Sequence, residues 1–185
     1  MLFSKEDFTV NGFQKGDYEN CRFENCDFSS TKVSDSQFTG CEFENCNLSL
    51  ANLSRTAIRD VRFINCKMLG IRFDTCNTLG FSPEFEHCLM DNCAFYKVNL
   101  KKVRFLNCRL HEADFAEANC TQTVFADCDL LNATFEQTNL EKADLRTAIH
   151  YLIHPESNQI KGAKFSLSGV YGLLARYGIV VDDLP

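Results

Sequence analysis

Residues 103–145 decide the fold, and they read VRFLN CRLHE ADFAE ANCTQ TVFAD CDLLN ATFEQ TNLEK ADL. The first letters of these groups of five are Val, Cys, Ala or Thr, and most of the remaining letters are polar. A period of five fits neither an α-helix, with 3.6 residues per turn, nor a simple strand, with a period of two. The third letters are all apolar: Phe105, Leu110, Phe115, Cys120, Phe125, Leu130, Phe135, Leu140 and Leu145.

The same period extends over most of the chain. Counting backwards in fives, the register holds to Phe85, and upstream it resumes two residues out of phase from Thr78 to Phe3. Of the 29 centre positions, 28 are apolar, with Thr78 as the exception, and 15 of the 17 Phe occupy them. The shift predicts a small insertion at 79–84, which contains Phe81. Repetition of this kind predicts one repeat domain over residues 1–165.

The fives group into larger units of 20 residues. Repeated identities at this spacing predict stacked coils with four sides of five residues, about eight coils in all, ~4.8 Å apart. Stacked aromatic rings suit this spacing, and a small residue two positions before each centre leaves room for the ring. Every fourth centre forms one column, Phe3, Phe23, Phe43, Phe63, Phe85, Phe105, Phe125 and Leu145, and a column of small residues consists of Cys26, Cys46, Cys66, Cys88, Cys108 and Cys128.

Individual groups match the pattern A(D/N)Lxx, namely CDF at 26–28, ANL at 51–53, ADF at 113–115, CDL at 128–130 and ADL at 143–145. In these groups the chain resembles the pentapeptide-repeat proteins, and the resemblance covers residues 1–148. It implies an all-β fold, a right-handed quadrilateral parallel β-helix, followed here by a short C-terminal α-helix.

The last forty residues depart from the repeat. Residues 149–165 are predicted to form a degenerate last coil with His150, Pro155 and Ile160 at its centres. Residues 166–185 are predicted to form a helix, capped by Ser166 or Ser168 and ended by Gly178, and a tail. We expect this helix to cover the last coil and also to join two chains as a homodimer. The residues on one helical face are Leu167, Val170, Leu174 and Tyr177.

Composition favours a cytoplasmic protein with reduced thiols. The N-terminus lacks a signal-peptide pattern, and no stretch approaches 18 uncharged apolar residues. The 11 Cys lie five or more apart without any CxxC, so core packing is expected rather than disulfides or a zinc site. The pair His150 and His154 has no evident third ligand. Because no phosphate-binding, nucleophile-elbow or metalloprotease motif occurs, neither enzymatic activity nor a cofactor or metal is expected.

Charge is distributed in bands along the chain. Residues 51–110 hold ten basic and five acidic side chains, whereas residues 111–160 hold nine acidic and two basic ones. The repeat places eight of these acidic side chains outward on all four sides, which predicts an acidic collar that contacts a partner. The alternative is that these carboxylates only keep the rod soluble. The collar consists of Glu112, Asp114, Glu117, Asp127, Asp129, Glu136, Glu141 and Asp144.

Residues 46–71 and 165–182 resemble the group that contains the Qnr quinolone-resistance and albicidin-resistance proteins. The resemblance implies a non-enzymatic, dimeric DNA mimic that binds a type II topoisomerase, DNA gyrase or topoisomerase IV, and protects it from quinolone-like or albicidin-like inhibitors. It implies no direct binding of nucleic acid and no membrane association. A generic protein-interaction scaffold with an unidentified cytoplasmic partner stays open, because a fold does not fix a function.

Overall fold

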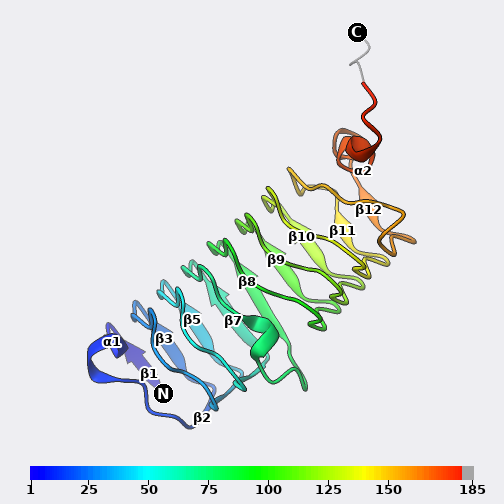
Figure 1. Cartoon of the computed structure of the whole chain (residues 1–185). Helices are drawn as coiled ribbons and strands as arrows, with labels where there is room; N and C mark the ends of the chain where they lie inside the picture. Colours follow the sequence, from blue (N-terminus) through cyan, green and yellow to red (C-terminus); the bar gives the residue numbers. More distant parts are fainter. Residues whose placement is uncertain (181–185) are drawn as a thin grey trace.

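The computed structural model describes residues 1–180, which form a rod of stacked coils (Figure 1). The N-terminus lies at one end of the rod, and the short helix α2 (Tyr171–Leu174) lies at the other. Nine short parallel strands, joined in order along the rod, make one sheet, and three others make a second sheet. The predicted parallel β-helix of about eight coils is confirmed.

The strands are two to four residues long. The nine-stranded sheet contains β1 (Leu2–Ser4), β3 (Arg22–Glu24), β5 (Glu42–Glu44), β7 (Val61–Ile64), β8 (Pro83–Glu86), β9 (Arg104–Leu106), β10 (Val124–Ala126), β11 (Asp144–Leu145) and β12 (Lys164–Phe165). The smaller sheet contains β2 (Asp17–Glu19), β4 (Gln37–Thr39) and β6 (Ala57–Arg59). The helical elements are α1 (Phe8–Asn11), α2, and the short 3-10 helices η1 (Phe73–Thr75), η2 (Ser168–Val170) and η3 (Ala175–Tyr177).

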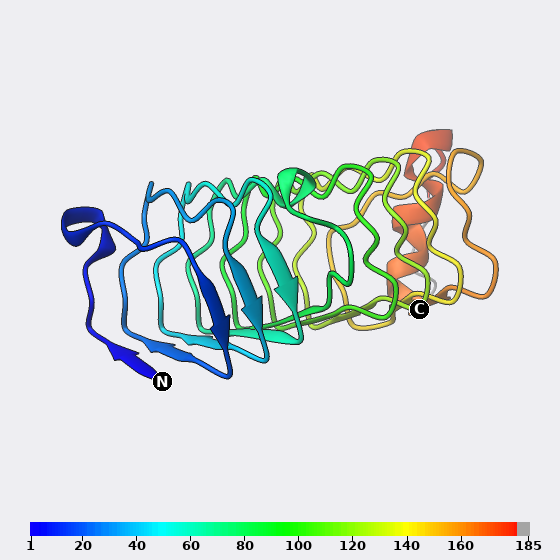
Figure 2. The ribbon, with the colours of Figure 1, turned by 90° about the horizontal axis from the view of Figure 1, so that it is seen from below.

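Each coil has four faces, which we number in chain order (Figure 2). The first face carries the Phe3 column and the nine-stranded sheet, and the fourth carries the smaller sheet. Single parallel bridges at the same spacing, such as Asp27 to Asn47 and Ala94 to Asp114, join coils along the second and third faces. Residues two positions after the centres turn the corners, and within residues 1–180, 23 non-glycine residues have positive φ, nearly all of them at these corners.

Aromatic stacking fills the rod, as the spacing predicts. On the first face the rings from Phe3 to Phe125 follow one another with centroids 4.6 to 5.4 Å apart and nearly parallel planes. Rings from opposite faces meet edge to face in the interior, as Phe95 of the third face does with Phe105 of the first at 5.7 Å. Because a buried Phe contributes about 1.5–3 kcal/mol, these columns are a major stabilising contribution.

The small inward residues leave space for the rings, and they also donate hydrogen bonds to backbone carbonyls of the preceding coil. The Cys46 thiol donates to the carbonyl of Phe23 at 3.3 Å, and the Thr123 hydroxyl donates to that of Leu100 at 2.8 Å. All 11 Cys are free and buried, which confirms that they are core residues. Burial raises the pKa of Cys120 to about 12, so this thiol stays protonated at neutral pH.

The two-residue shift has a specific structural consequence on the fourth face. Thr78, which the register places inside, is exposed, and Phe81 is buried in its place with its ring 6.0 Å from that of Phe73. Pairing resumes at once, because Pro83 in β8 lies opposite Val61 in β7. The extra residues therefore bulge from one corner, and the columns continue in register beyond them.

The last coil also departs from the predicted register. His150 is exposed, whereas Tyr151 and Ile153 are buried at 3% and 0% exposure. The expected centre at His150 is therefore wrong, because the neighbouring aromatic side chain buries far more apolar surface there. Pro155 and Ile160 are half-buried. The shift by one residue leaves His150 on the surface, beside Asp129.

Candidate partner-binding surface

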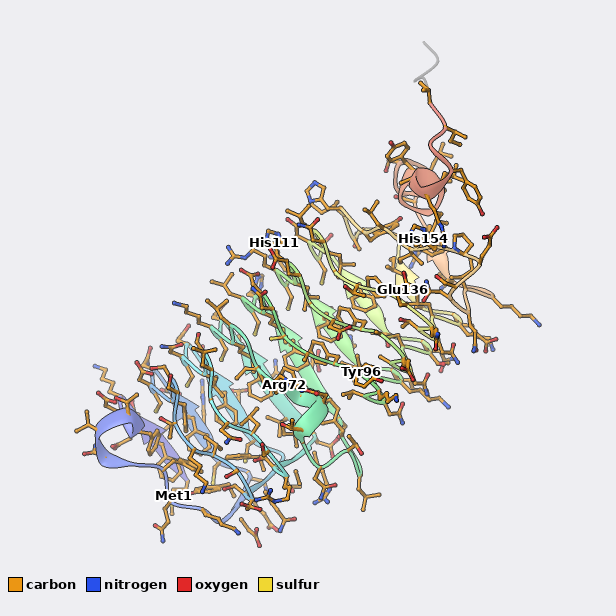
Figure 3. All side chains as sticks on the ribbon, viewed as in Figure 1. Met1, Arg72, Tyr96, His111, Glu136 and His154 are labelled. Atoms are coloured by element: carbon orange, nitrogen blue, oxygen red, sulfur yellow. The ribbon has the colours of Figure 1, made fainter. Side chains whose placement is uncertain are left out.

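The repeat directs all eight collar side chains outward, and none of these residues is buried. Three of them, Glu112, Glu117 and Asp127, stand at corners with φ between 54° and 56°. The collar surrounds the C-terminal half of the rod, and Figure 3 shows Glu136 there, farther along the rod than Arg72 and Tyr96. By position in the coils, the first face carries Asp127 and Asp144, the second Glu112 and Asp129, the third Asp114, Glu117 and Glu136, and the fourth Glu141.

Three collar carboxylates accept hydrogen bonds from nearby backbone N–H groups and so stabilise the coil. An oxygen of Asp114 accepts the backbone N–H of Ala116 at 2.9 Å, and Asp129 and Asp144 each accept the N–H two residues later at 3.2 Å. Asn119 does the same for Thr121 at 3.1 Å, so the amide serves as well as the carboxylate. This short-range bond explains why the repeat has Asp or Asn before its centre residue.

Among the described residues, basic side chains lie within 4.0 Å of three of the eight carboxylates, those of Glu117, Asp144 and Asp129. Glu117 accepts the Tyr96 hydroxyl at 2.9 Å and lies 3.3 Å from the Lys97 ammonium, and both contacts hold its pKa below the usual range. Asp144 forms a two-pronged contact with Arg146, with N–O distances of 2.9 and 2.7 Å. The hydrogen bonds from Arg146 likewise lower the pKa of Asp144.

Asp129 is held between two histidines from neighbouring coils. Its oxygens lie 2.8 Å from His111 Nε2 and 2.8 Å from His150 Nδ1. Partial burial tends to raise the pKa of this carboxyl, but the two imidazoles outweigh burial and lower it. The sequence offered little sign of this cluster, because its members lie 18 and 21 residues apart and the register prediction placed His150 inside.

The other charged collar residues remain uncompensated by side chains. Within residues 1–180, no basic side chain lies within 4.0 Å of a carboxylate oxygen of the other five collar residues. Of these five, Asp114 accepts a backbone N–H, and the remaining four accept none from the same range. One of the four stands on each face of the coil, so free negative charge encircles the rod. We call these four the open quartet: Glu112, Asp127, Glu136 and Glu141.

In the part of the chain that the structure describes, five of the ten basic side chains in the basic band form ion pairs between coils. On the first face Arg62 lies 2.9 Å from Glu42, and Arg104 lies 3.4 Å from Glu84. Arg22 also contacts Glu42, at 3.2 Å, so charges of opposite sign alternate along the sheet. The alternation is visible in the sequence at the coil spacing, but sequence reasoning treated the band as a single charge excess. Cross-strand pairs of this kind stabilise a sheet modestly.

The C-terminal helical segment rests on the last coil. Ser166 Oγ accepts the N–H of Gly169 at 3.0 Å, the carbonyl of Gly172 accepts the N–H of Ile153 at 3.0 Å, and Leu173 packs against the core. Gly178 ends the segment with φ of 62°. Of the predicted dimer residues, Leu167 and Tyr177 are exposed and Val170 and Leu174 are half-buried. The last five residues of the predicted tail lie outside the described residues.

Comparison with known proteins identifies the repeat. A family model described as the pentapeptide repeat region matches residues 13–82 and 81–167. The chain belongs to the pentapeptide-repeat family. No curated protein matches its sequence.

Two solved structures resemble this pentapeptide-repeat chain over nearly its whole length. Both are trypsin-treated variants of QnrB1, described as a plasmid-mediated fluoroquinolone resistance protein. The first is 20% identical with a TM-score of 0.64 and covers 99% of each chain. The second is 19% identical with a TM-score of 0.65 and covers 98% of each chain. At this identity the likeness establishes the shared fold.

Neither a metal cluster nor a membrane span is found in the described part of this pentapeptide-repeat protein. No group of three or more His, Cys, Asp or Glu side chains in residues 1–180 could hold a metal ion. In the same range, no helix is long and apolar enough to cross a membrane.

Proposed function

We propose that this chain is a non-enzymatic cytoplasmic DNA mimic that binds a type II topoisomerase, DNA gyrase or topoisomerase IV, through the acidic collar. The observation that carries the proposal is the open quartet, which presents an unpaired carboxylate on every face of the rod. The shared fold with QnrB1, described as a fluoroquinolone resistance protein, supports it.

The linear charge density of the collar is similar to that of duplex DNA. Residues 111–160 make about 2.5 coils, or ~12 Å of axis at ~4.8 Å per coil. Duplex DNA carries about seven charges over ~12 Å, at one per ~1.7 Å, and this segment carries nine acidic and two basic side chains. Such a surface would steer the chain toward the basic DNA-binding surface of the enzyme, with an effect that weakens as salt rises.

The proposed dimer places two collars near its middle. Helix α2 lies at the end of the rod next to the coils that carry the collar (Figure 1). Two rods of ~38 Å joined there would measure ~75 Å at the stated coil rise. We expect Leu174→Asp to give a folded monomer in multi-angle light scattering, and an unchanged dimer mass would exclude this interface.

Inhibition of supercoiling by purified gyrase tests the mimicry. Glu112→Gln, Asp127→Asn, Glu136→Gln and Glu141→Gln together remove the four open charges. The matched control, Glu6→Gln, Asp17→Asn, Glu19→Gln and Asp60→Asn, removes four acidic charges elsewhere.

The unsubstituted chain should inhibit supercoiling at micromolar concentration or below, and less at high salt. The quartet variant should need about tenfold more protein for the same inhibition, a loss of ~1.4 kcal/mol, and should respond less to salt. The control should behave like the unsubstituted chain. Equal losses in the two variants would mean that only net charge matters, and the collar would lose its role.

Protection from drugs is a separate part of the proposal. It predicts that the chain reduces the DNA cleavage that a quinolone or albicidin produces with gyrase, at protein concentrations below those that inhibit supercoiling. Inhibition of supercoiling without a reduction in drug-induced cleavage would support DNA mimicry and contradict a role in drug resistance.

The second candidate function is a protein-interaction scaffold with an unidentified cytoplasmic partner. The observation in its favour is a set of exposed leucines on the second face, where Leu50 is 65% and Leu131 is 42% exposed. A chain without effect on supercoiling, with or without quinolone, would favour this function over the first.

A further inference from the structure

A pocket of about 680 Å³ lies where the last two coils meet the C-terminal helical segment. Its volume falls within the range of small-molecule sites, ~300–1,000 Å³. None of the predicted dimer residues and none of the collar acids lines it. The pocket therefore adjoins the proposed dimer interface on helix α2, through Tyr171 and Gly172, but is lined by different residues. Its wall includes Leu131, Ile149, Tyr151, Leu152, Tyr171 and Gly172.

The apolar wall is a departure from the repeat that packing does not require. Leu131, Ile149 and Leu152 point outward and are 42%, 51% and 49% exposed. One and two coils earlier, the positions equivalent to Ile149 hold Asp129 and Arg109, in keeping with an outward surface. Apolar side chains gathered around a concave site are typical of binding sites for apolar ligands.

Two glycines allow the helical segment to approach the pocket floor. A side chain at Gly169 would meet the Tyr151 hydroxyl at 2.0 Å, and one at Gly172 would meet the Tyr151 carbonyl at 2.2 Å. The aromatic ring is thus clamped beneath the segment. Tyr151 is 3% exposed, yet its hydroxyl has no hydrogen-bond partner, although it lies beside the pocket-lining Gly169 and near Ser166.

The polar groups around the pocket favour an uncharged ligand. Arg146 is engaged by Asp144, and His150 by Asp129. Ser166 and Ser168 contribute neutral hydroxyls to the lining. A buried hydroxyl without a partner destabilises the free chain, and an acceptor atom of a ligand would satisfy it.

We propose that this pocket binds an uncharged, predominantly apolar small molecule that accepts a hydrogen bond from the Tyr151 hydroxyl. Residues 166–169 cover the Tyr151 hydroxyl in the free chain, so the ligand displaces this short segment slightly outward when it binds. The proposal goes beyond the proposed function and does not depend on it.

Nile red, an uncharged apolar dye with a carbonyl acceptor, is the probe. Its fluorescence rises in apolar surroundings, so titration of the full chain reports binding directly. Leu131→Trp fills the mouth of the pocket, and Leu89→Trp is the matched control, because Leu89 is 39% exposed on the same face but outside the pocket. Tyr151→Phe removes only the unpartnered hydroxyl.

We expect saturable binding of one dye per chain, at least tenfold weaker in Leu131→Trp and unchanged in Leu89→Trp. Tyr151→Phe should weaken binding about threefold to tenfold, while its thermal midpoint stays at or above that of the unsubstituted chain. Absence of saturable binding, or equal binding by Leu131→Trp or Tyr151→Phe, would overturn the proposal. Binding by the Leu174→Asp monomer but not by the dimer would overturn it too, and would assign the pocket to contact between two copies.

Discussion

Phe105→Ala tests the stacked core at its centre. The Phe105 ring is fully buried, with centroids 5.0 Å from Phe85 and 5.2 Å from Phe125 in its own column. It also meets Phe95 at 5.7 Å and Phe115 at 6.1 Å, edge to face. Replacing a buried Phe by Ala lowers the free energy of unfolding by about 3–5 kcal/mol. Since four ring contacts disappear together, we expect about 4–5 kcal/mol, the upper part of that range.

Two variants separate stacking from burial. Phe105→Leu keeps most of the apolar volume, as Leu145 does in the same column, and should cost about 1–1.5 kcal/mol. Phe3→Ala removes a half-buried ring that stacks on one side only, against Phe23 at 4.6 Å. It should cost no more than about half of the Phe105→Ala value.

Urea unfolding followed by circular dichroism gives these free energies, with a second probe to verify cooperative unfolding in a repeat protein. If Phe105→Ala costs no more than Phe3→Ala, the continuous ring column is not what holds the coils together. A cost below about 2 kcal/mol would likewise refute the reasoning from buried aromatic area.

Four further predictions concern individual groups. Thr123→Val removes one of two hydrogen bonds to the buried Leu100 carbonyl, which still accepts the Val103 N–H, and should cost about 0.5–1.5 kcal/mol in urea unfolding; no loss would show that the hydroxyl is dispensable. Iodoacetamide at pH 7.5 should label Cys120 only after unfolding, because burial raises its pKa to about 12; rapid labelling in the native state, seen by mass spectrometry, would contradict this. Arg146 lowers the pKa of Asp144, so the stability from that pair is complete above pH ~3.9 and disappears as pH falls further; Asp144→Asn should keep the turn and show a shallower acid dependence in thermal melts. Gly172→Ala should lower the thermal midpoint, because the added carbon would lie 2.2 Å from a backbone oxygen, and an unchanged midpoint would show that the helical segment is loosely held.

The repeat could be predicted from sequence because its rule is local and identical in every coil. A centre residue and a small residue two positions earlier share one interior layer, so a shift of register would expose both. Phe3 therefore lies opposite Phe23, as the 20-residue spacing requires, and across the two-residue bulge Phe63 still lies opposite Phe85.

The rule fails where two neighbouring residues compete for one inward position. At the last coil the strict count selects His150, but Tyr151 is larger and more apolar and takes the interior. At the bulge Phe81 displaces Thr78 for the same reason. Side-chain transfer energies alone favour both outcomes, so a count weighted by burial would have found them.

The shape of the pocket and the ion pairs of the collar depend on how separate coils and the C-terminal helical segment pack against one another. Asp129 meets histidines from the coils on either side, and Glu117 meets Lys97. Net charge over a segment does not contain this information. Sequence placed the collar side chains on the surface, and only the structure separates compensated charges from open ones.

This separation determines which acidic residues carry information about a partner. Asp114, like Asp129 and Asp144, occupies the position where the repeat needs an Asp or Asn oxygen to bind a backbone N–H, so its charge follows partly from folding. The open quartet has no such need, because the equivalent positions one coil away hold neutral residues: Asn132 for Glu112, Asn107 for Asp127, Ala116 for Glu136 and Thr121 for Glu141. Charge retained where the fold would accept a neutral side chain calls for a reason outside the fold. A partner that recognises negative charge from every side of a rod supplies that reason, which is why the quartet, and not the acidic segment as a whole, is the surface to test.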